Sequence, residues 1–193
     1  MGIEFELKYT ATVQAQTSLE QTISGEWSTL QMETTYYDTK EGYLSQRHYT
    51  LRRRLENGKS VCTVKTPAAD NSRGEWETEC QDILAAIPEL CKLGAPKDLP
   101  VFGAMGLIPV CGARFTRRAC TLEYGDAVLE LALDRGVLFS EEKEIPLCEV
   151  EVELKSGSRE AAIAFGKELA AAYGLQTEHK SKFRRALDLR EGE

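Results

Sequence analysis

The sequence predicts an α+β fold built on an antiparallel sheet or barrel, and three observations support this prediction. Segments that alternate between apolar and polar residues recur along the chain, as in strands that bury one face. Asn57-Gly58 separates two such segments and is typical of a hairpin turn. Residues 158–173 instead have the spacing of an amphipathic helix. The length of 193 residues suits one large domain, so we expect a single domain over residues 1–193.

Strands are expected where this alternation, or a run of β-branched and aromatic residues, is found. The expected strands are residues 3–9, 30–39, 73–81 and 148–157, two strands within 42–66 joined at Asn57-Gly58, and two within 113–136 joined at Gly125-Asp126. Most of these strands follow one another through short turns. The sheet is therefore expected to be antiparallel.

Helices are expected between the strands, where capping residues flank apolar runs. A short helix is expected around residues 18–23, a helix at 82–94 that Pro88 kinks or splits, and another short helix at 97–107. The helix at 158–173 has Ser158 as N-cap and Gly174 as its stop. The C-terminal tail is expected to start as a short helix or turn and to end frayed.

Composition excludes several classes of function. The net charge of −7 disfavours general binding of nucleic acid, although basic residues gather in short clusters that suit an anion at one specific site. No apolar run is long enough to cross a membrane and no signal-peptide pattern is present, so we expect a cytoplasmic protein without a membrane partner. The six cysteines are scattered without a Cys-x-x-Cys pair, which disfavours zinc and favours free thiols.

The polar faces of the expected strands are rich in glutamate and arginine. Glu149, Glu151 and Glu153 share one face, as do Arg52 and Arg54. A sandwich with solvated outer faces would explain this pattern, and so would a closed barrel whose charged faces line a lumen. A lumen crowded with charge is costly unless it holds compensating ions. Carboxylates suit Mg²⁺ or Mn²⁺, whereas arginine and lysine suit phosphates.

The N-terminal Glu4-x-Glu6-x-Lys8 resembles the ExExK signature of the CYTH superfamily, the triphosphate tunnel metalloenzymes. Further elements resemble this family in the expected order: YYDT (36–39), TLRRR (50–54), TVKT (63–66), RGEWE (73–77), ARFTRR (113–118), LALDRG (131–136), EVEVEL (149–154) and SKFRRA (181–186). The resemblance implies a closed antiparallel β-barrel of about eight strands that forms a tunnel, with helices packed outside. The bacterial inorganic triphosphatases are the branch it resembles most.

The resemblance also implies roles for particular residues. Glu4 and Glu6 would bind Mg²⁺ or Mn²⁺ together with Glu151 and Glu153. The triphosphate would be clamped by Lys8, Arg52, Arg54, Lys65 and Arg117, with Lys182 from a C-terminal helix and with help from Arg73. Glu75 and Asp134 would complete the catalytic set by binding a second metal or positioning the attacking water.

Several of these assignments have alternatives. Glu149 fits a metal role and a solvated strand end equally well, and Arg73 fits a surface position as well as substrate binding. Asp134 and Glu75 could instead orient the arginines through ion pairs. Three arginines are expected to be solvated because they do not share the inward parity or lie outside the motif, namely Arg53, Arg118 and Arg184. If the register slipped by one residue, Arg53 would face inward in place of Arg52 and Arg54.

The expected function is metal-dependent hydrolysis of the terminal phosphoryl group of inorganic triphosphate, giving diphosphate and phosphate. Three alternatives stay open: a class IV adenylyl cyclase, a thiamine triphosphatase, and a binder of polyphosphate or nucleotide without catalytic activity. The expected partner is a small-molecule triphosphate rather than a nucleic acid, and the expected oligomeric state is a monomer or homodimer.

Overall fold

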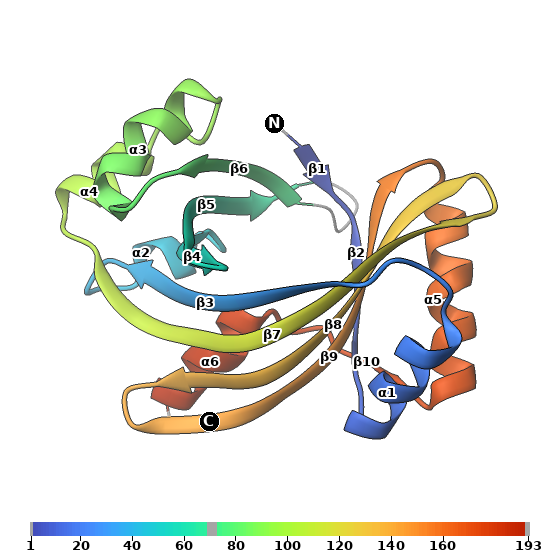
Figure 1. Ribbon diagram of the computed structural model, residues 1–193. Helices are drawn as coiled ribbons and strands as arrows, with labels where there is room; N and C mark the ends of the chain where they lie inside the picture. The colour runs from blue at the N-terminus through green and yellow to red at the C-terminus, as the bar shows by residue number, and fades with distance from the viewer. Residues whose placement is uncertain (1, 69–72, 192–193) are drawn as a thin grey trace.

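The molecule is built on one strongly curved antiparallel sheet, shown in Figure 1. The structure is a computed structural model that describes residues 2–68 and 73–191, and the side chains of residues 4–68 and 73–190. The strands are β1 (Gly2–Glu4), β2 (Glu6–Thr10), β3 (Ser28–Asp38), β4 (Thr50–Glu56), β5 (Lys59–Pro67), β6 (Arg73–Glu79), β7 (Ile108–Tyr124), β8 (Ala127–Ser140), β9 (Lys143–Ser156) and β10 (Gln176–Thr177). The helices are α1 (Val13–Thr22), α2 (Tyr43–Gln46), α3 (Ile83–Lys92), α4 (Leu99–Ala104), α5 (Arg159–Tyr173) and α6 (Lys182–Glu191).

The prediction of a closed barrel of about eight strands was wrong. In the described part of the chain the sheet has ten strands in the order β1-β6-β5-β4-β3-β7-β8-β9-β2-β10, and no pairing joins its two ends. The N-terminal strand is interrupted at Phe5, so that residues 2–4 pair with β6 whereas residues 6–10 pair with β9. The two halves thus lie at the first and ninth positions of the strand order. An alternating sequence does not reveal where a strand changes its partner.

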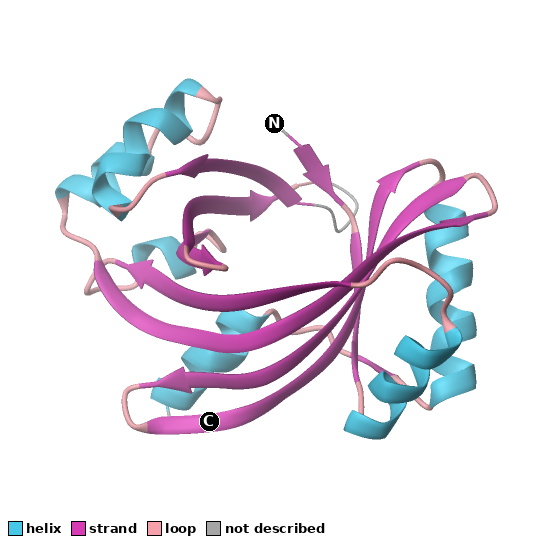
Figure 2. Cartoon of the chain, viewed as in Figure 1, coloured by secondary structure: helices cyan, strands magenta, loops and turns pink. Residues whose placement is uncertain are grey.

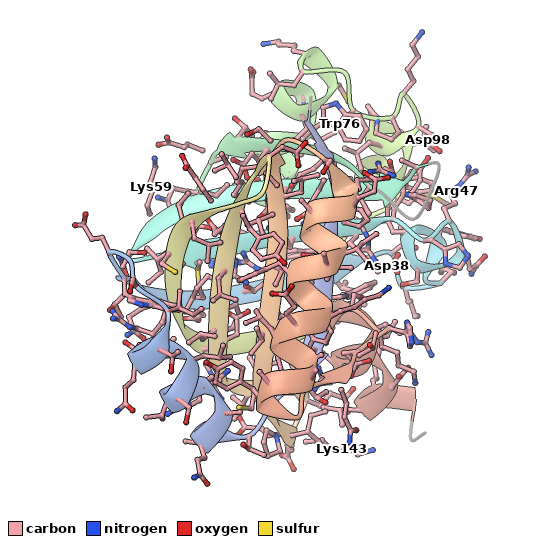
Figure 3. All side chains as sticks on the ribbon, turned by 90° about the vertical axis from the view of Figure 1, so that its right-hand side faces the viewer. Asp38, Arg47, Lys59, Trp76, Asp98 and Lys143 are labelled. Atoms are coloured by element: carbon pink, nitrogen blue, oxygen red, sulfur yellow. The ribbon has the colours of Figure 1, made fainter. Side chains whose placement is uncertain are left out.

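The helices divide between the two faces of the sheet (Figure 2). We call inner the face that carries Arg54, Arg117 and Glu151, and outer the opposite face. On the outer face α1 and α5 pack over β8, β9 and β2 through residues such as Leu19 and Phe165; Figure 3 shows α5 covering this part of the sheet. Helices α2, α3 and α4 pack over β4–β6. Helix α6 packs against the inner face instead, where it closes one side of the concave surface.

Local capping explains which helices the sequence predicted well. Helix α5 begins where expected because the Ser158 side chain accepts a hydrogen bond from the Ala161 N–H, and it ends at Gly174, whose φ of 66° is left-handed. Helix α1 starts earlier than residue 18 because Thr12 caps it in the same way. Helix α3 runs through Pro88 without splitting. Proline lacks the N–H that would bond to a carbonyl one turn earlier, but Pro88 is on the exposed side of the helix, where water can bond to that carbonyl instead.

Several segments differ from the predicted strands. Residues 43–46 form helix α2 rather than a strand, because the buried Asp38 carboxylate accepts hydrogen bonds from the backbone N–H groups of Thr39, Leu44 and Ser45. Strands β7 and β9 begin at Ile108 and Lys143, earlier than expected, and β8 continues to Ser140. The predicted turn at Gly125-Asp126 is confirmed.

The tail forms the ten-residue helix α6, and the frayed end expected at residues 192–193 lies outside the described residues. No helix in the described ranges is both long and apolar enough to cross a membrane.

Candidate functional site

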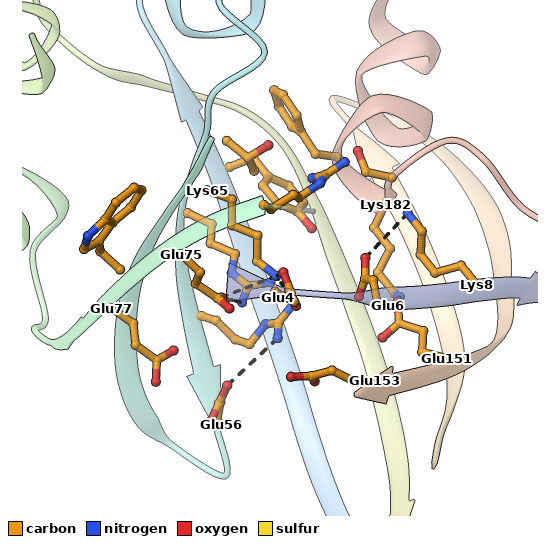
Figure 4. A pocket seen from close by; sticks show the side chains of 18 of the residues that line it. Glu4, Glu6, Lys8, Glu56, Lys65, Glu75, Glu77, Glu151, Glu153 and Lys182 are labelled. Carbon is orange, nitrogen blue, oxygen red and sulfur yellow. Dashed lines mark hydrogen bonds and ion pairs between the residues drawn. The ribbon is translucent and has the colours of Figure 1, made fainter. Parts of the chain in front are cut away.

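The inner face of the sheet and the start of α6 enclose a cavity of about 550 Å³ (Figure 4). Most of its lining is charged. The lining residues are Glu4, Glu6, Lys8, Tyr36, Thr50, Arg52, Arg54, Glu56, Lys65, Arg73, Glu75, Trp76, Glu77, Leu93, Arg117, Glu151, Glu153, Lys155, Ser181, Lys182 and Phe183. Every residue predicted for the site is among them except Asp134, which lies behind Arg117 and is fully buried.

Strand register places the charged residues next to one another. Across the β2–β9 pair, Lys8 is opposite Glu151 and Glu6 is opposite Glu153. Residues opposite each other in an antiparallel pair present their side chains on the same face. The alternation of charge in β2 and β9 therefore collects three carboxylates and an ammonium group on the inner surface.

The four carboxylates predicted to bind metal point into the cavity from β1, β2 and β9 (Figure 4). Burial raises the pKa of Glu6, and the neighbouring negative charge of Glu151 raises it further. Among the described cations only Lys8 comes within 4.0 Å of the Glu6 carboxylate, at 3.8 Å. Glu6 is thus a half-buried carboxylate that is short of positive charge.

Glu4 and Glu153 are more nearly balanced than Glu6. Burial would raise the pKa of Glu4, but Lys65 lies 2.7 Å from its Oε1 and the net shift is downward. Glu153 is nearer the rim, where Lys155 lies 2.9 Å away. Burial still raises the pKa of Glu153. The four residues could hold a divalent cation, since their ligand atoms are the hard oxygens that Mg²⁺ and Mn²⁺ prefer.

A second acidic cluster contains Asp134, Glu149 and Glu151, whose carboxylate oxygens lie within 4.8 Å of one another. The Lys182 ammonium lies among them, 2.9 Å from Asp134, 2.6 Å from Glu151 and in contact with Glu149. These carboxylates are paired already, and a metal ion would have to displace the lysine. Burial alone would lower the pKa of Lys182, but the three carboxylates together raise it far above its ordinary value.

Glu149 is fully buried, and its carboxylate also contacts Arg185. The alternative that Glu149 lies at a solvated strand end is therefore wrong. Asp134 accepts two hydrogen bonds from Arg117, from Nε and Nη2, both at 2.7 Å. Burial would raise the pKa of Asp134, but Arg117 and Lys182 reverse that effect and hold it below its ordinary value. Asp134 thus orients two cations.

The arginines of β4 have the opposite imbalance to Glu6. Arg54 is 6% exposed, and of the described carboxylates only Glu56 comes within 4.0 Å of its guanidinium, at 3.9 Å. Burial, with the nearby charge of Arg52, lowers the pKa of Arg54 to about 10, so that it stays positive at neutral pH. The Nε of Arg52 is buried without a hydrogen-bond partner among the described residues, and its carboxylate neighbour Glu75 is 3.7 Å away.

The three arginines expected to be solvated lie outside the cavity, but each is only partly exposed. Arg53 donates a hydrogen bond from Nη1 to the Gln81 carbonyl and does not line the cavity, so the register did not slip. Arg118 pairs with Glu20 on the outer face, and Arg184 pairs with Asp188 within α6. Arg73, which could equally have been a surface residue, lines the cavity.

Sequence reasoning missed other charged residues of the site, namely Glu56, Glu77, Lys155 and Arg185. The first three share the inward parity of the predicted residues on their strands, so parity alone could have found them. Arg185 follows Lys182 by three positions on one helix and shares its side, a spacing that could have been used. Trp76 packs in the outer-face cluster under α3 and also borders the cavity.

The comparisons with known proteins agree with this geometry. The chain is 27% identical over 190 residues to an inorganic triphosphatase of Haemophilus influenzae, covering 94% of this chain and 53% of that protein. The chain thus spans about half the length of this curated relative.

Solved structures share the fold. The Hippeastrum protein HpAC1, whose description reports a dominant triphosphatase activity, superposes with a TM-score of 0.68 at 19% identity, covering 100% of this chain and 97% of that one. The PH1819 protein of Pyrococcus horikoshii gives 0.66 at 22% identity, covering 97% and 99%. The family model described as the CYTH domain matches residues 2–187, and the chain therefore belongs to the CYTH domain family.

Proposed function

We propose that this protein hydrolyses inorganic triphosphate to diphosphate and phosphate with the help of Mg²⁺ or Mn²⁺. The observation that carries the proposal is the pair of opposite charge deficits in one cavity. Glu6 is short of positive charge, whereas Arg52 and Arg54 are short of negative charge. A complex of a divalent cation with a polyanion would compensate both, because it presents both signs of charge within a few ångströms. The similarity to an inorganic triphosphatase supports the same substrate class.

The donor set fits a divalent metal. Glu4, Glu6, Glu151 and Glu153 offer only carboxylate oxygens, and the first three lie on neighbouring parts of the cavity wall. When bound there, the metal would neutralise phosphoryl charge and lower the pKa of a water molecule that it holds. A histidine base is then not required for the reaction.

The chain's own residues would bind and orient the substrate. Arg54 and Arg52, whose Nε has no hydrogen-bond partner among the described residues, would hold phosphoryl oxygens, with Lys65 and Arg73 beside them. Lys8, Arg117 and Lys182 would reach the oxygens from the opposite side of the cavity. As water attacks the terminal phosphorus, the bond to the bridging oxygen breaks and its electron pair leaves with the diphosphate. These cations would stabilise the charge that develops on that leaving group.

Glu75 is the candidate for positioning the attacking water. It lines the cavity and lies 3.3 Å from Lys65 and 3.7 Å from Arg52. Asp134 is hidden behind Arg117 and pairs with it and with Lys182. This favours an orienting role for Asp134 over direct contact with water or with a second metal.

The decisive test compares Glu6→Gln with wild type for phosphate release from inorganic triphosphate, in Mg²⁺, Mn²⁺ or chelator. We expect metal-dependent hydrolysis in wild type and a loss of roughly a hundredfold or more in the variant, because one charged metal ligand is removed. Mn²⁺ binding, measured by titration calorimetry, should weaken in parallel. Glu33→Gln is the matched control, since Glu33 is exposed on the outer face and does not line this cavity.

Other substrates decide between the alternatives. Formation of cyclic AMP from ATP would replace the proposal with a cyclase, and faster turnover of thiamine triphosphate would change the substrate. Tight binding of triphosphate without turnover of any of these compounds would indicate a binding protein.

A further inference from the structure

Gln16 is a buried polar residue at a position where the helix pattern calls for an apolar one. On α1 it lies between Ala15 and Leu19 on the side that faces the sheet, and it is 2% exposed. Burying an amide among apolar side chains is unfavourable unless its hydrogen bonds are replaced. Such a departure from the apolar helix pattern indicates a specific role for the buried side chain.

The amide of Gln16 joins the backbones of two strands directly beneath the cavity. Its Nε2 donates to the Asp134 carbonyl at 3.0 Å and to the Glu149 carbonyl at 2.7 Å. Its Oε1 accepts a hydrogen bond from Arg135 Nε at 3.1 Å, and Arg135 Nη2 is 3.3 Å from the Val13 carbonyl. Both donors of the amide are thus used, and the amide itself is fixed by Arg135 from the outer face.

The two residues held in this way carry the carboxylates that hold Lys182. Asp134 and Glu149 are directly opposite each other on β8 and β9, and their side chains point to the inner face. There they contact the Lys182 ammonium at the base of the cavity. One amide group bound to both carbonyls fixes the spacing of the two strands at this point, and thereby the spacing of the two carboxylates.

We propose that Gln16 is a positioning residue that sets the location of the Lys182 ammonium from the far side of the sheet. The inference rests on the proposed function in one respect, namely that Lys182 contacts the triphosphate. Gln16 does not line the cavity and touches no part of it. Its effect on the reaction must therefore pass through the backbones of β8 and β9.

The test replaces the amide by an apolar side chain of similar length, Gln16→Met, and measures two quantities at a temperature where all variants are folded. The first is the KM for inorganic triphosphate, which should rise roughly ten- to hundredfold because a binding group is displaced. The second is the rate at which acetic anhydride acetylates Lys182, followed by peptide mass spectrometry. This rate should also rise at least severalfold, since Lys182 is 7% exposed and held by three carboxylates.

Two controls separate positioning from simple loss of stability. Gln14→Met makes the same substitution on the same helix at an exposed site, and should change neither quantity. Leu19→Ala removes a fully buried side chain of α1 and lowers stability without removing the amide. If Gln16→Met behaves like Leu19→Ala in both measurements, the proposal is overturned.

The acetylation rate needs no enzymatic activity. It therefore decides the role of Gln16 even if wild-type protein fails to hydrolyse triphosphate, which would refute the proposed function alone. Faster acetylation of Lys182 in Gln16→Met but not in Gln14→Met or Leu19→Ala would still support positioning.

Discussion

At the scale of single residues, charge balance locates the site more sharply than the motifs do. Glu6 and Arg54 both belong to motif-like segments, but so do residues that are already paired, such as Asp134. What distinguishes the half-buried Glu6 and the buried Arg54 is that each has too little opposite charge nearby. The sequence predicted that both face inward. It could not predict which charges remain uncompensated, because that depends on contacts between strands that are far apart in the chain.

The buried thiols give a residue-scale prediction about pH. Burial raises the pKa of Cys111 from its ordinary value of 9.0 to about 12. Above pH 9 the unfolded chain loses this proton while the folded protein keeps it, so stability must fall as the pH rises from about 9 towards 12. A shift of this size corresponds to about 3 kcal/mol by pH 11. Urea unfolding midpoints of wild type and Cys111→Ala, measured at intervals across this range, test the prediction.

The slope with pH is the quantity to compare, because removal of the thiol also leaves a small cavity at every pH. Cys91→Ala is the matched control, since Cys91 is less buried. Equal slopes for wild type and Cys111→Ala would refute the assignment of the alkaline sensitivity to this thiol.

At the scale of elements, the sequence predicted what local chemistry decides. Both ends of α5 followed from Ser158 and Gly174, which act within a few residues of themselves. The sequence did not predict α2, because Asp38 caps it from six and seven residues away. Nor did it predict the interruption at Phe5, since the change of partner from β6 to β9 is set by the whole sheet.

Helix α6 gives a prediction at this scale, because its docking on the inner face brings Lys182 into the cavity. Phe183 is 8% exposed, and its ring centroid is 5.1 Å from that of Tyr36. We expect Phe183→Ala to lower the free energy of unfolding by about 3 kcal/mol, as for other buried aromatic truncations. Arg184→Ala, the next residue on the more exposed side, should cost much less. Chemical unfolding measures both, and equal losses would contradict the docking of α6 through Phe183.

At the scale of the whole molecule, a single curved sheet separates two environments. Its outer face meets two groups of helices through apolar side chains, whereas its inner face gathers charge around the cavity. A net charge of −7 would oppose the approach of a polyanion, so local arrangement rather than total charge must provide the attraction. The sequence predicted this division of faces through parity. It did not predict that the sheet is open, because closure depends on pairing at its two ends.

The open sheet leads to a prediction about local stability. The end strands β1 and β10 have only three and two paired residues, each with a neighbour on one side. Their amide hydrogens should therefore exchange faster than those of β8, which is paired along its length with both β7 and β9. NMR-detected hydrogen exchange on the metal-free protein would measure this order directly.

Ligand binding should then affect hydrogen exchange differently in the two end strands. Glu4 on β1 lines the cavity, whereas the residues of β10 are exposed. A complex of Mg²⁺ with inorganic triphosphate, held by Glu4 and Glu6 together, would connect the two halves of the interrupted strand and slow exchange in β1. At a hundredfold excess over its dissociation constant, a ligand stabilises the state it binds by about 2.7 kcal/mol, so the slowing in β1 should be large. Exchange in β10 should stay unchanged, and equal protection of both strands would mean that the ligand stabilises the protein without contacting β1.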